Sequence, residues 1–339
     1  MKYDDAPQIV KNYLAYKGTT QGRSDLTVFQ YYHDLRTFFR FILKEKYKDR
    51  YEKTDVTEIN FSDCTDEDII SVTTDDIYNF LIYTNDSLEN KSAARARKLC
   101  TIRGFYKYLV SRYIIEENPA EKIDSPKQPR RLPKYLTLEE SEKLLSSIGG
   151  KNFHRDYAII TIFLNCGVRV SELANISLAD IDKDITKLTV IGKGNKERIV
   201  YLNNACHDAI TEYLKVRPSD TKRESRNALF VSRNRNRLNV KTIQWLVYKY
   251  LKAAGLEYKH LSVHKLRHTA ATLMYQSGKT DIRVLKDILG HESLSTTQIY
   301  THVADEQMKK ALDSNPLSEI KVPKITFPSD DASEKNDKT

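Results

Sequence analysis

Apolar residues recur at intervals of three and four along several stretches of this chain, the spacing of one face of an α-helix. The same pattern predicts helices over residues 92–110, 205–216 and 240–254. It is strongest in residues 26–43, where these positions are held by Leu26, Phe29, Tyr32, Leu35, Phe38, Phe39 and Ile42. The pattern indicates a mainly helical protein.

Two threonines predict the starts of further helices. Thr73 stands three residues before Asp76, and Thr137 stands three residues before Glu140, which is the spacing of a capping box. Residues 44–68 differ from these stretches because they carry many charges and little periodicity. We interpret that stretch as a long connection between helices.

The second half of the chain combines helices with two short strands. Residues 158–164 are nearly all apolar and predict a buried helix that ends at Gly167, so that Arg169 opens the next helix. Residues 187–191 and 197–201 predict strands around a glycine-rich turn. The strands predict a small antiparallel sheet.

Polar and cationic residues lie at the ends of the last predicted helices. A helix from His264 to Gly278 places His264 and Arg267 one turn apart, so both side chains can reach the same phosphate. Residues 281–289 predict one more helix, closed by Gly290, with His291 just beyond it.

Residues 124–134 predict a linker, because their three prolines disfavour regular structure. The linker divides residues 1–123 from residues 135–315, and the polar residues 316–339 predict a disordered tail. It is either a solvated tether or a segment that crosses a DNA strand, through its basic residues Lys127, Arg130, Arg131 and Lys134.

Composition and charge narrow the classes of protein. The net charge of +9 fits a polyanionic partner, although excess charge also favours solubility. The four cysteines are scattered without a Cys-x-x-Cys pair, which favours a reducing compartment over a disulfide framework or zinc ribbon. Without a signal-peptide pattern or a long apolar run, we expect a cytoplasmic protein.

Basic residues recur along one side of the helix predicted over residues 92–110. Lys91, Arg95 and Lys98 are spaced by four and three, as neighbours on one helical face are. Such a stripe either lies along a phosphate backbone or faces water. We predict that these three residues contact DNA.

The candidate chemistry centres on Tyr300. A tyrosine hydroxyl with a pKa of about 10 is a poor nucleophile, so a reactive tyrosine needs groups that neutralise charge on its target. Forked guanidinium donors suit the oxygens of a pentavalent phosphate. Upstream of Tyr300 the chain has five residues that could neutralise this charge or bind the phosphate: Arg169, Lys193, His264, Arg267 and His291.

A metal site is the alternative for part of this set. His264 and His268 have the i, i+4 spacing of a helical zinc pair, but a zincin needs Glu where Lys265 stands. We therefore expect no metal ion at these histidines.

The ordered set resembles the signature of the tyrosine recombinase (integrase) family, and within it the Xer branch. That signature reads Arg, Lys, His-x-x-Arg, Leu-Gly-His and a Tyr nine residues after that His, as Tyr300 follows His291. The resemblance runs from about residue 24 to residue 317. It implies a helical SAM-like domain that clamps DNA, followed by an α-rich catalytic domain with a small antiparallel sheet.

The resemblance also implies roles for individual residues. Tyr300 attacks the scissile phosphate, giving a 3′-phosphotyrosyl bond and a free 5′-hydroxyl. Arg169 and Arg267 bind the non-bridging oxygens. Among the remaining residues, Lys193 protonates the leaving oxygen, His264 takes the tyrosine proton, and His291 hydrogen-bonds the phosphate. Neither a cofactor nor a metal is needed.

The family further implies partners. Double-stranded DNA with a specific core site is the substrate, and four protomers act together on two duplexes. Residues 304–312 carry only a narrow apolar stripe and need a groove to dock in, which in this family lies on a neighbouring protomer. A paralogous recombinase and an FtsK-type DNA translocase are further partners of the Xer branch, which resolves chromosome or plasmid dimers.

Three other functions remain open at this point. The chain could be the integrase of a mobile element, which differs in its genetic context. It could be a type IB topoisomerase, which relaxes DNA without partners. From a different class, it could be a DNA-binding architectural protein with an idle active site.

Overall fold

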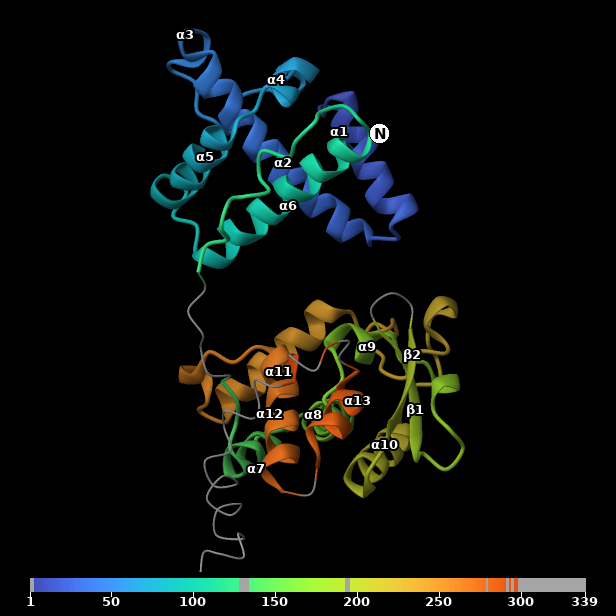
Figure 1. Cartoon of the computed structure of the whole chain (residues 1–339). Coiled ribbons are helices and arrows are strands. Elements are labelled where there is room, and N and C mark those ends of the chain that lie inside the picture. Colours follow the sequence, from blue (N-terminus) through green and yellow to red (C-terminus); the bar gives the residue numbers. More distant parts are fainter. Residues whose placement is uncertain are drawn as a thin grey trace, which may run out of the picture. The chain divides into compact units, whose positions relative to one another are not determined.

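The computed structural model describes most of the chain, namely residues 3–127, 134–192, 196–278, 280–290, 293, 296 and 297. The chain divides into two compact units, Met1–Arg131 and Leu132–Thr339 (Figure 1). Among the described residues the only sheet is a two-stranded antiparallel one, and the rest of the regular structure is helical. The predicted fold class, mainly α with a small antiparallel sheet, is confirmed.

The first unit is a helical assembly around α2, whose Phe38 and Phe39 are fully buried. The ring of Phe39 meets the ring of Phe105 on α6 edge to face, with centroids 5.7 Å apart. The described elements of this unit are α1 (Gln8–Ala15), the π-helical turn η1 (Tyr16–Thr20), α2 (Asp25–Lys46), α3 (Lys48–Tyr51), the 3₁₀ turn η2 (Phe61–Asp63), α4 (Asp66–Ile70), α5 (Thr74–Asp86) and α6 (Ser92–Ser111).

Residues 44–68 are more ordered than the predicted connection. They contain the end of α2, all of α3 and η2, and the start of α4. Tyr51 and Phe61 are buried in the core of the first unit. Elements of three to five residues are too short to show a helical period, which is why the pattern missed them.

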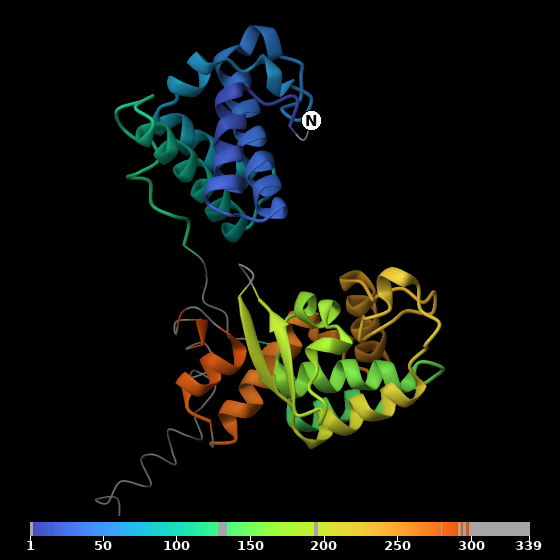
Figure 2. The same cartoon turned by 90° about the vertical axis from the view of Figure 1, so that its right-hand side faces the viewer.

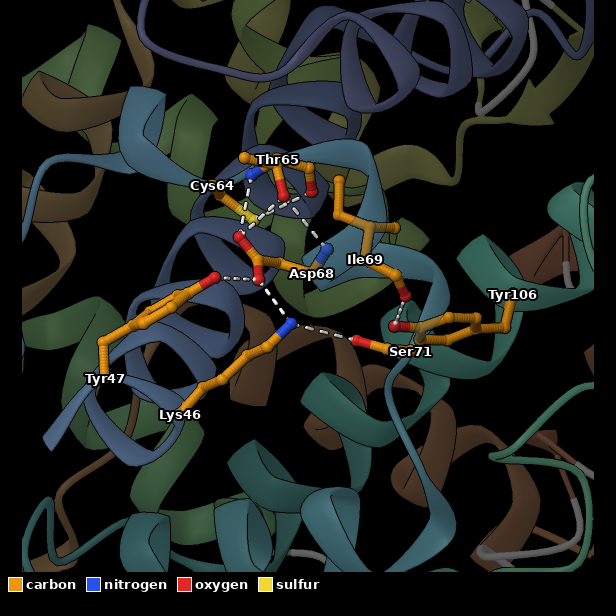
Figure 3. A network of polar contacts seen from close by, with 8 residues as sticks. All are labelled: Lys46, Tyr47, Cys64, Thr65, Asp68, Ile69, Ser71 and Tyr106. Carbon is orange, nitrogen blue, oxygen red and sulfur yellow. Dashed lines mark hydrogen bonds and ion pairs between the residues drawn. The ribbon is translucent and has the colours of Figure 1, made fainter.

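The buried carboxylate of Asp68 holds the rest of this segment, residues 47–68, to the end of α2, as Figure 3 shows. We call residues 47–68 the insertion. Asp68, only 1% exposed, accepts hydrogen bonds from Lys46 Nζ at 2.6 Å and from the Tyr47 hydroxyl at 2.8 Å. It also closes a capping box with Thr65 at the start of α4. Burial alone would raise the pKa of Asp68, but these hydrogen bonds outweigh it and lower that pKa.

Lys98, one of the three residues of the predicted basic stripe, does not face the surface of α6. The Lys98 side chain is buried, and its ammonium lies 3.5 Å from the buried carboxylate of Asp34 on α2. That carboxylate also pairs with Arg97 and accepts a hydrogen bond from the Thr101 hydroxyl. Lys98 turns inward because the buried carboxylate of Asp34 requires cationic partners. The prediction missed this because the spacing of residues along α6 does not show which charges on α2 they will meet.

The second unit is built around α8, in which residues 158–164 are all buried, as predicted. Helix α8 lies beside α10, and the strands β1 and β2 form a hairpin (Figure 2). The described elements of this unit are α7 (Leu138–Ser146), α8 (Phe153–Cys166), α9 (Val170–Asn175), η3 (Leu178–Asp180), β1 (Lys187–Ile191), β2 (Glu197–Tyr201), α10 (Asn204–Val216), η5 (Arg223–Ser225), α11 (Val240–Ala253), η6 (Glu257–Lys259), α12 (Val263–Gln276) and α13 (Ile282–Leu289).

Local signals in the sequence are confirmed at several element ends. Thr73 forms its capping box with Asp76 at the start of α5, and Thr137 forms one with Glu140 at the start of α7. The strands pair in antiparallel register, with Thr189 opposite Ile199. These predictions held because each depends on contacts within a few residues.

Two of the cysteines that are scattered in the sequence come together in the fold. Cys166 at the end of α8 and Cys206 on α10 are buried, with sulfurs 3.7 Å apart, and all four cysteines are free thiols. None of the helices described in the chain is both long and apolar enough to cross a membrane.

The Asp68 network generates a test of stability. We expect Asp68→Asn to lower the free energy of unfolding by about 2 kcal/mol, because the donors of Lys46, Tyr47 and Thr65 lose the charged acceptor that the buried Asp68 provides. The difference from the native chain should be full above pH 3.8, the ordinary pKa of Asp, and shrink as the pH falls below it, because the folded-state pKa is lowered.

Urea unfolding followed by far-ultraviolet circular dichroism measures this effect. Asp66→Asn, two residues earlier on the exposed face of α4, is the matched control and should change stability by less than about 0.5 kcal/mol. Equal losses in the two variants would contradict the role of Asp68.

Candidate active site

The site begins at the junction between α8 and α9. Gly167 caps α8 in the left-handed conformation, with a φ of 60°. A Cβ there would lie 3.0 Å from Leu289 Cδ2 of α13, so both the backbone conformation and the packing require glycine. The turn allows the chain to reverse within three residues and places Arg169 at the N-cap of α9, as predicted.

Arg169 joins α9 to the end of α13. Its backbone N–H donates to Glu172 Oε2 at 2.7 Å, and its guanidinium Nη1 donates to Glu172 Oε1 at 2.7 Å. Its Nη2 donates to the backbone carbonyl of Gly290 at 3.3 Å. Both terminal nitrogens of the predicted catalytic arginine therefore have a partner, which fixes the orientation of its guanidinium.

Arg267 of α12 holds the same end of α13 from another direction. Its side chain is only 1% exposed, and its Nη1 donates to the Gly167 carbonyl at 2.7 Å. Its Nη2 donates to the carbonyl of Leu289. The last carbonyls of a helix carry partial negative charge and have no partner within the helix, so these two arginines satisfy them.

His264 lies one turn before Arg267 on α12, on its exposed side. Its ring meets that of His268 edge to face, with centroids 4.8 Å apart. The pKa of His264 is lowered from its ordinary value, first by desolvation and then by the charges of Arg267, Lys265 and Arg169. Near neutral pH the imidazole is therefore uncharged and able to accept a proton.

The turn of the β1–β2 hairpin carries Lys193, and we call it the lysine loop. Its first residue, Gly192, lies beside the carboxylate of Glu172. The N–H of Gly192 donates to the carbonyl of Lys196 at 2.7 Å and closes the loop between the strands. Lys193 itself lies outside the described residues. So do His291 and Tyr300, although Gly290, the residue before His291, is described and closes α13 with a φ of 63°.

Two residues of this site escaped the sequence-based prediction, Glu172 and Arg198. Glu172 is 3% exposed, and Arg198 on β2 donates to both its oxygens, at 2.6 and 2.9 Å. Burial alone would raise the pKa of Glu172, but the hydrogen bonds and charges of Arg198 and Arg169 lower it to about 2. The sequence Arg-Val-Ser-Glu could have indicated that Glu172 bonds back to Arg169, because the two are three residues apart. The contact of Arg198 with Glu172 could not be predicted in this way, because the two residues lie far apart in the sequence.

A cavity of about 670 Å³ borders this cluster between α9 and β1. Its lining includes Arg169 and Glu172, the base of the lysine loop at Gly192, and the charged side chains of Asp180 and Arg237. Arg237 donates to the carbonyl of Ile176 at 2.8 Å and so fixes the far end of α9. The cavity gives Arg169 an open side.

The residues predicted to contact DNA lie in different surroundings. Lys91 and Lys134 are exposed and Arg95 is partly exposed, whereas Lys98 is buried as described above. Arg130 and Arg131 fall outside the described residues. Within the described ranges, no group of three or more His, Cys, Asp or Glu side chains is arranged to hold a metal ion.

Comparison with known proteins identifies the class to which this fold and site belong. Residues 134–307 match the model of the phage integrase family. The whole-chain fold resembles the XerH site-specific recombinase in a post-cleavage complex with a palindromic difH substrate, with a TM-score of 0.66 and 23% identity over 90% of this chain and 94% of that one. The chain belongs to the phage integrase family.

More similar relatives narrow the class. The chain is 51% identical to a tyrosine recombinase XerC of Caldanaerobacter subterraneus subsp. tengcongensis, over 92% of this chain and 88% of that protein. It is 34% identical to a tyrosine recombinase XerD of Proteus mirabilis, over 90% and 92%. The protein is an Xer-like tyrosine recombinase, a DNA-binding enzyme that breaks and rejoins DNA strands at specific sites.

The close packing at the end of α13 generates a second test. Gly290 and Gly278 both have positive φ, but a Cβ on Gly290 would lie 2.8 Å from Arg198 Cδ, whereas a Cβ on Gly278 would meet nothing within 4 Å. We expect Gly278→Ala to lower the free energy of unfolding by about 1 kcal/mol, the strain of a left-handed alanine. Gly290→Ala should lower it by about 3 kcal/mol, because displacement of Arg198 adds to the strain.

Urea unfolding of the two full-length variants measures the difference, and Gly278→Ala serves as the control for backbone strain. Losses of equal size in both would show that the contact between Gly290 and Arg198 does not contribute to stability.

Proposed function

We propose that this recombinase cleaves DNA through Tyr300, which forms a 3′-phosphotyrosyl bond and releases a 5′-hydroxyl. The observation that carries the proposal is the convergence of Arg169 and Arg267 from α9 and α12. They bind consecutive backbone carbonyls, Gly290 and Leu289, directly before His291. The end of α13, directly before His291, thus lies beside both arginines.

In this proposal the arginines stabilise the charge that builds on the phosphate. Arg169 and Arg267 donate to the non-bridging oxygens, which become more negative as the phosphorus becomes pentavalent. A guanidinium has five N–H donors, so one group can bind protein acceptors and a phosphate oxygen together. Fixing the guanidinium planes beforehand lowers the cost of reorganisation during the reaction.

The remaining residues move protons. His264 takes the proton of the Tyr300 hydroxyl, a role supported by its lowered pKa, which keeps the imidazole neutral near pH 7. Lys193 protonates the leaving 5′-oxygen, and His291 hydrogen-bonds the phosphate. The phosphotyrosyl bond conserves the energy of the phosphodiester, so neither a nucleotide cofactor nor a metal enters the chemistry.

The first unit and the linker hold the DNA in this proposal. Exposed Lys91 and Lys134, partly exposed Arg95, and the linker residues Arg130 and Arg131 bind backbone phosphates. Lys98 does not join them because its ammonium is engaged with Asp34.

The cellular role that we propose is resolution of chromosome or plasmid dimers, which takes place in the cytoplasm with the DNA. Two duplexes need four active sites, so a homo- or hetero-tetramer assembles through the helix of residues 304–312. Relatives named XerC and XerD support a paralogous partner, and an FtsK-type translocase is the proposed regulator. Integration or excision of a mobile element is the alternative, which an excisionase gene beside this one would favour.

Substitution of the nucleophile tests the chemistry. The target site is first located by sequencing genomic fragments that are covalently trapped on the protein, and a nicked version of that site is then used as a suicide substrate. Tyr300→Phe should bind this DNA with an unchanged Kd and form no covalent adduct, because the attacking oxygen is missing. Tyr201→Phe, an exposed tyrosine on β2, is the control and should form adduct normally. Adduct formation by Tyr300→Phe would refute the proposal.

Truncation tests the assembly. A chain ending at Thr301 should bind its site with little loss of affinity but fail to complete strand exchange between two sites, because residues 304–312 are missing. Gel-shift and plasmid recombination assays measure the two properties. Recombination at the rate of the full-length chain would refute the proposed role of residues 304–312.

A further inference from the structure

Arg198 occupies a position where three parts of the site meet. It lies on β2, two residues after the described edge of the lysine loop, and its side chain is only 15% exposed. Its Nη1 and Nη2 donate to Glu172 Oε1 and Oε2 at 2.6 and 2.9 Å. This two-pronged contact fixes the plane of its guanidinium.

The stem of Arg198 also presses against the end of α13. A Cβ on Gly290 would lie 2.8 Å from Arg198 Cδ and 3.0 Å from its Nε, so the arginine fills the space that a side chain would take. The carbonyl of the same glycine accepts from Arg169. Gly290 is therefore held by Arg198 through packing and by Arg169 through a hydrogen bond.

The third contact lies at the root of the lysine loop. A Cβ on Gly192 would lie 3.6 Å from Glu172 Oε1 and 3.8 Å from Arg198 Nη1. The loop that carries Lys193 therefore starts directly against the Arg198–Glu172 pair. A shift of the guanidinium would change the space available to Gly192 and to Gly290 together.

We propose that Arg198 is a positioning residue that holds Arg169, Gly192 at the base of the lysine loop, and Gly290 at the end of α13 in one arrangement. The inference rests on the proposed roles of Arg169, Lys193 and His291. In this arrangement Arg198 acts through its contacts with Glu172 and Gly290, while Arg169 and Arg267 donate to the scissile phosphate.

The alternative is that Arg198 and Glu172 form an ion pair that only stabilises the fold. Removing one partner of a buried ion pair usually destabilises a protein, because it leaves the other charge uncompensated, although Glu172 would keep Arg169. A loss of stability is thus expected for either role. Stability alone therefore does not separate the two roles. A kinetic measurement separates them, because a positioning residue affects the cleavage step more than DNA binding.

The variants are Arg198→Gln, which removes the charge, and Arg198→Lys, which keeps it but reaches only one oxygen at a time. Arg217→Gln is the matched control, because Arg217 donates to the carbonyls of Ala228 and Leu229 and shares no contact with the cluster. The full-length proteins are compared for Kd and for the rate of covalent trapping on the nicked site.

For Arg198→Gln we expect a Kd within about twofold of the native value and a trapping rate reduced about 100-fold, the effect of misplacing catalytic groups by about an ångström. Arg198→Lys should recover part of that rate. Arg217→Gln should trap at the native rate. A native trapping rate in Arg198→Gln, or equal losses of rate in Arg198→Gln and Arg217→Gln, would overturn the proposal.

The pH profile provides a readout that general destabilisation would not change. In the native chain Glu172 stays ionised well into the acid range, with a pKa of about 2, and Arg198 is the strongest influence that lowers it. The charged groups around it are Arg169 and Arg198 in contact, with Asp180 and Arg237 on the adjoining cavity. In Arg198→Gln the pKa of Glu172 rises, so the loss of trapping caused by protonation of Glu172 should move to a higher pH, whereas the loss caused by protonation of His264 is common to both chains.

Tyr300→Phe is measured in parallel. If that variant still formed adduct, the proposed nucleophile would be wrong. If it formed none while Arg198→Gln kept the native rate and pH profile, the nucleophile would stand and only the role of Arg198 would fail.

Discussion

The buried carboxylate of Glu172 is the charge on which the described part of the active site depends. Two arginines from distant positions in the sequence, Arg169 and Arg198, both donate to it. A carboxylate at 3% exposure is costly to bury unless cations compensate it, and two guanidinium groups held so close together repel each other unless a carboxylate lies between them. Each charge therefore requires the others, and the geometry of this cluster follows from that requirement.

The first unit repeats this use of a buried carboxylate for a structural purpose. Asp34 of α2 pairs with Arg97 and Lys98 of α6, and Asp68 of α4 pairs with Lys46 at the end of α2. In both cases a single acidic group fixes the position of a neighbouring element. The basic character of the chain is therefore not all available to DNA, because part of it is used inside the protein.

The sequence was informative wherever the cause of a structure is local. The helical periods, the capping boxes and the two strands depend on neighbours within a few residues, and the structure places them as expected. Lys98 and Arg198 illustrate the opposite case, because the partner of each lies far away in the chain and becomes visible only when the elements pack. Spacing along α6 could not show that one of the three basic residues, Lys98, turns inward.

The glycine at the end of α8 has a consequence for engineering. Exchanging glycine for alanine is a common route to heat-resistant enzymes where the backbone permits it. Gly167 does not permit it, because its conformation is left-handed and Leu289, Ala270 and Arg267 surround it. Gly149 has open space and no positive φ, so thermostabilisation of this recombinase should begin there and leave the α8–α9 junction untouched.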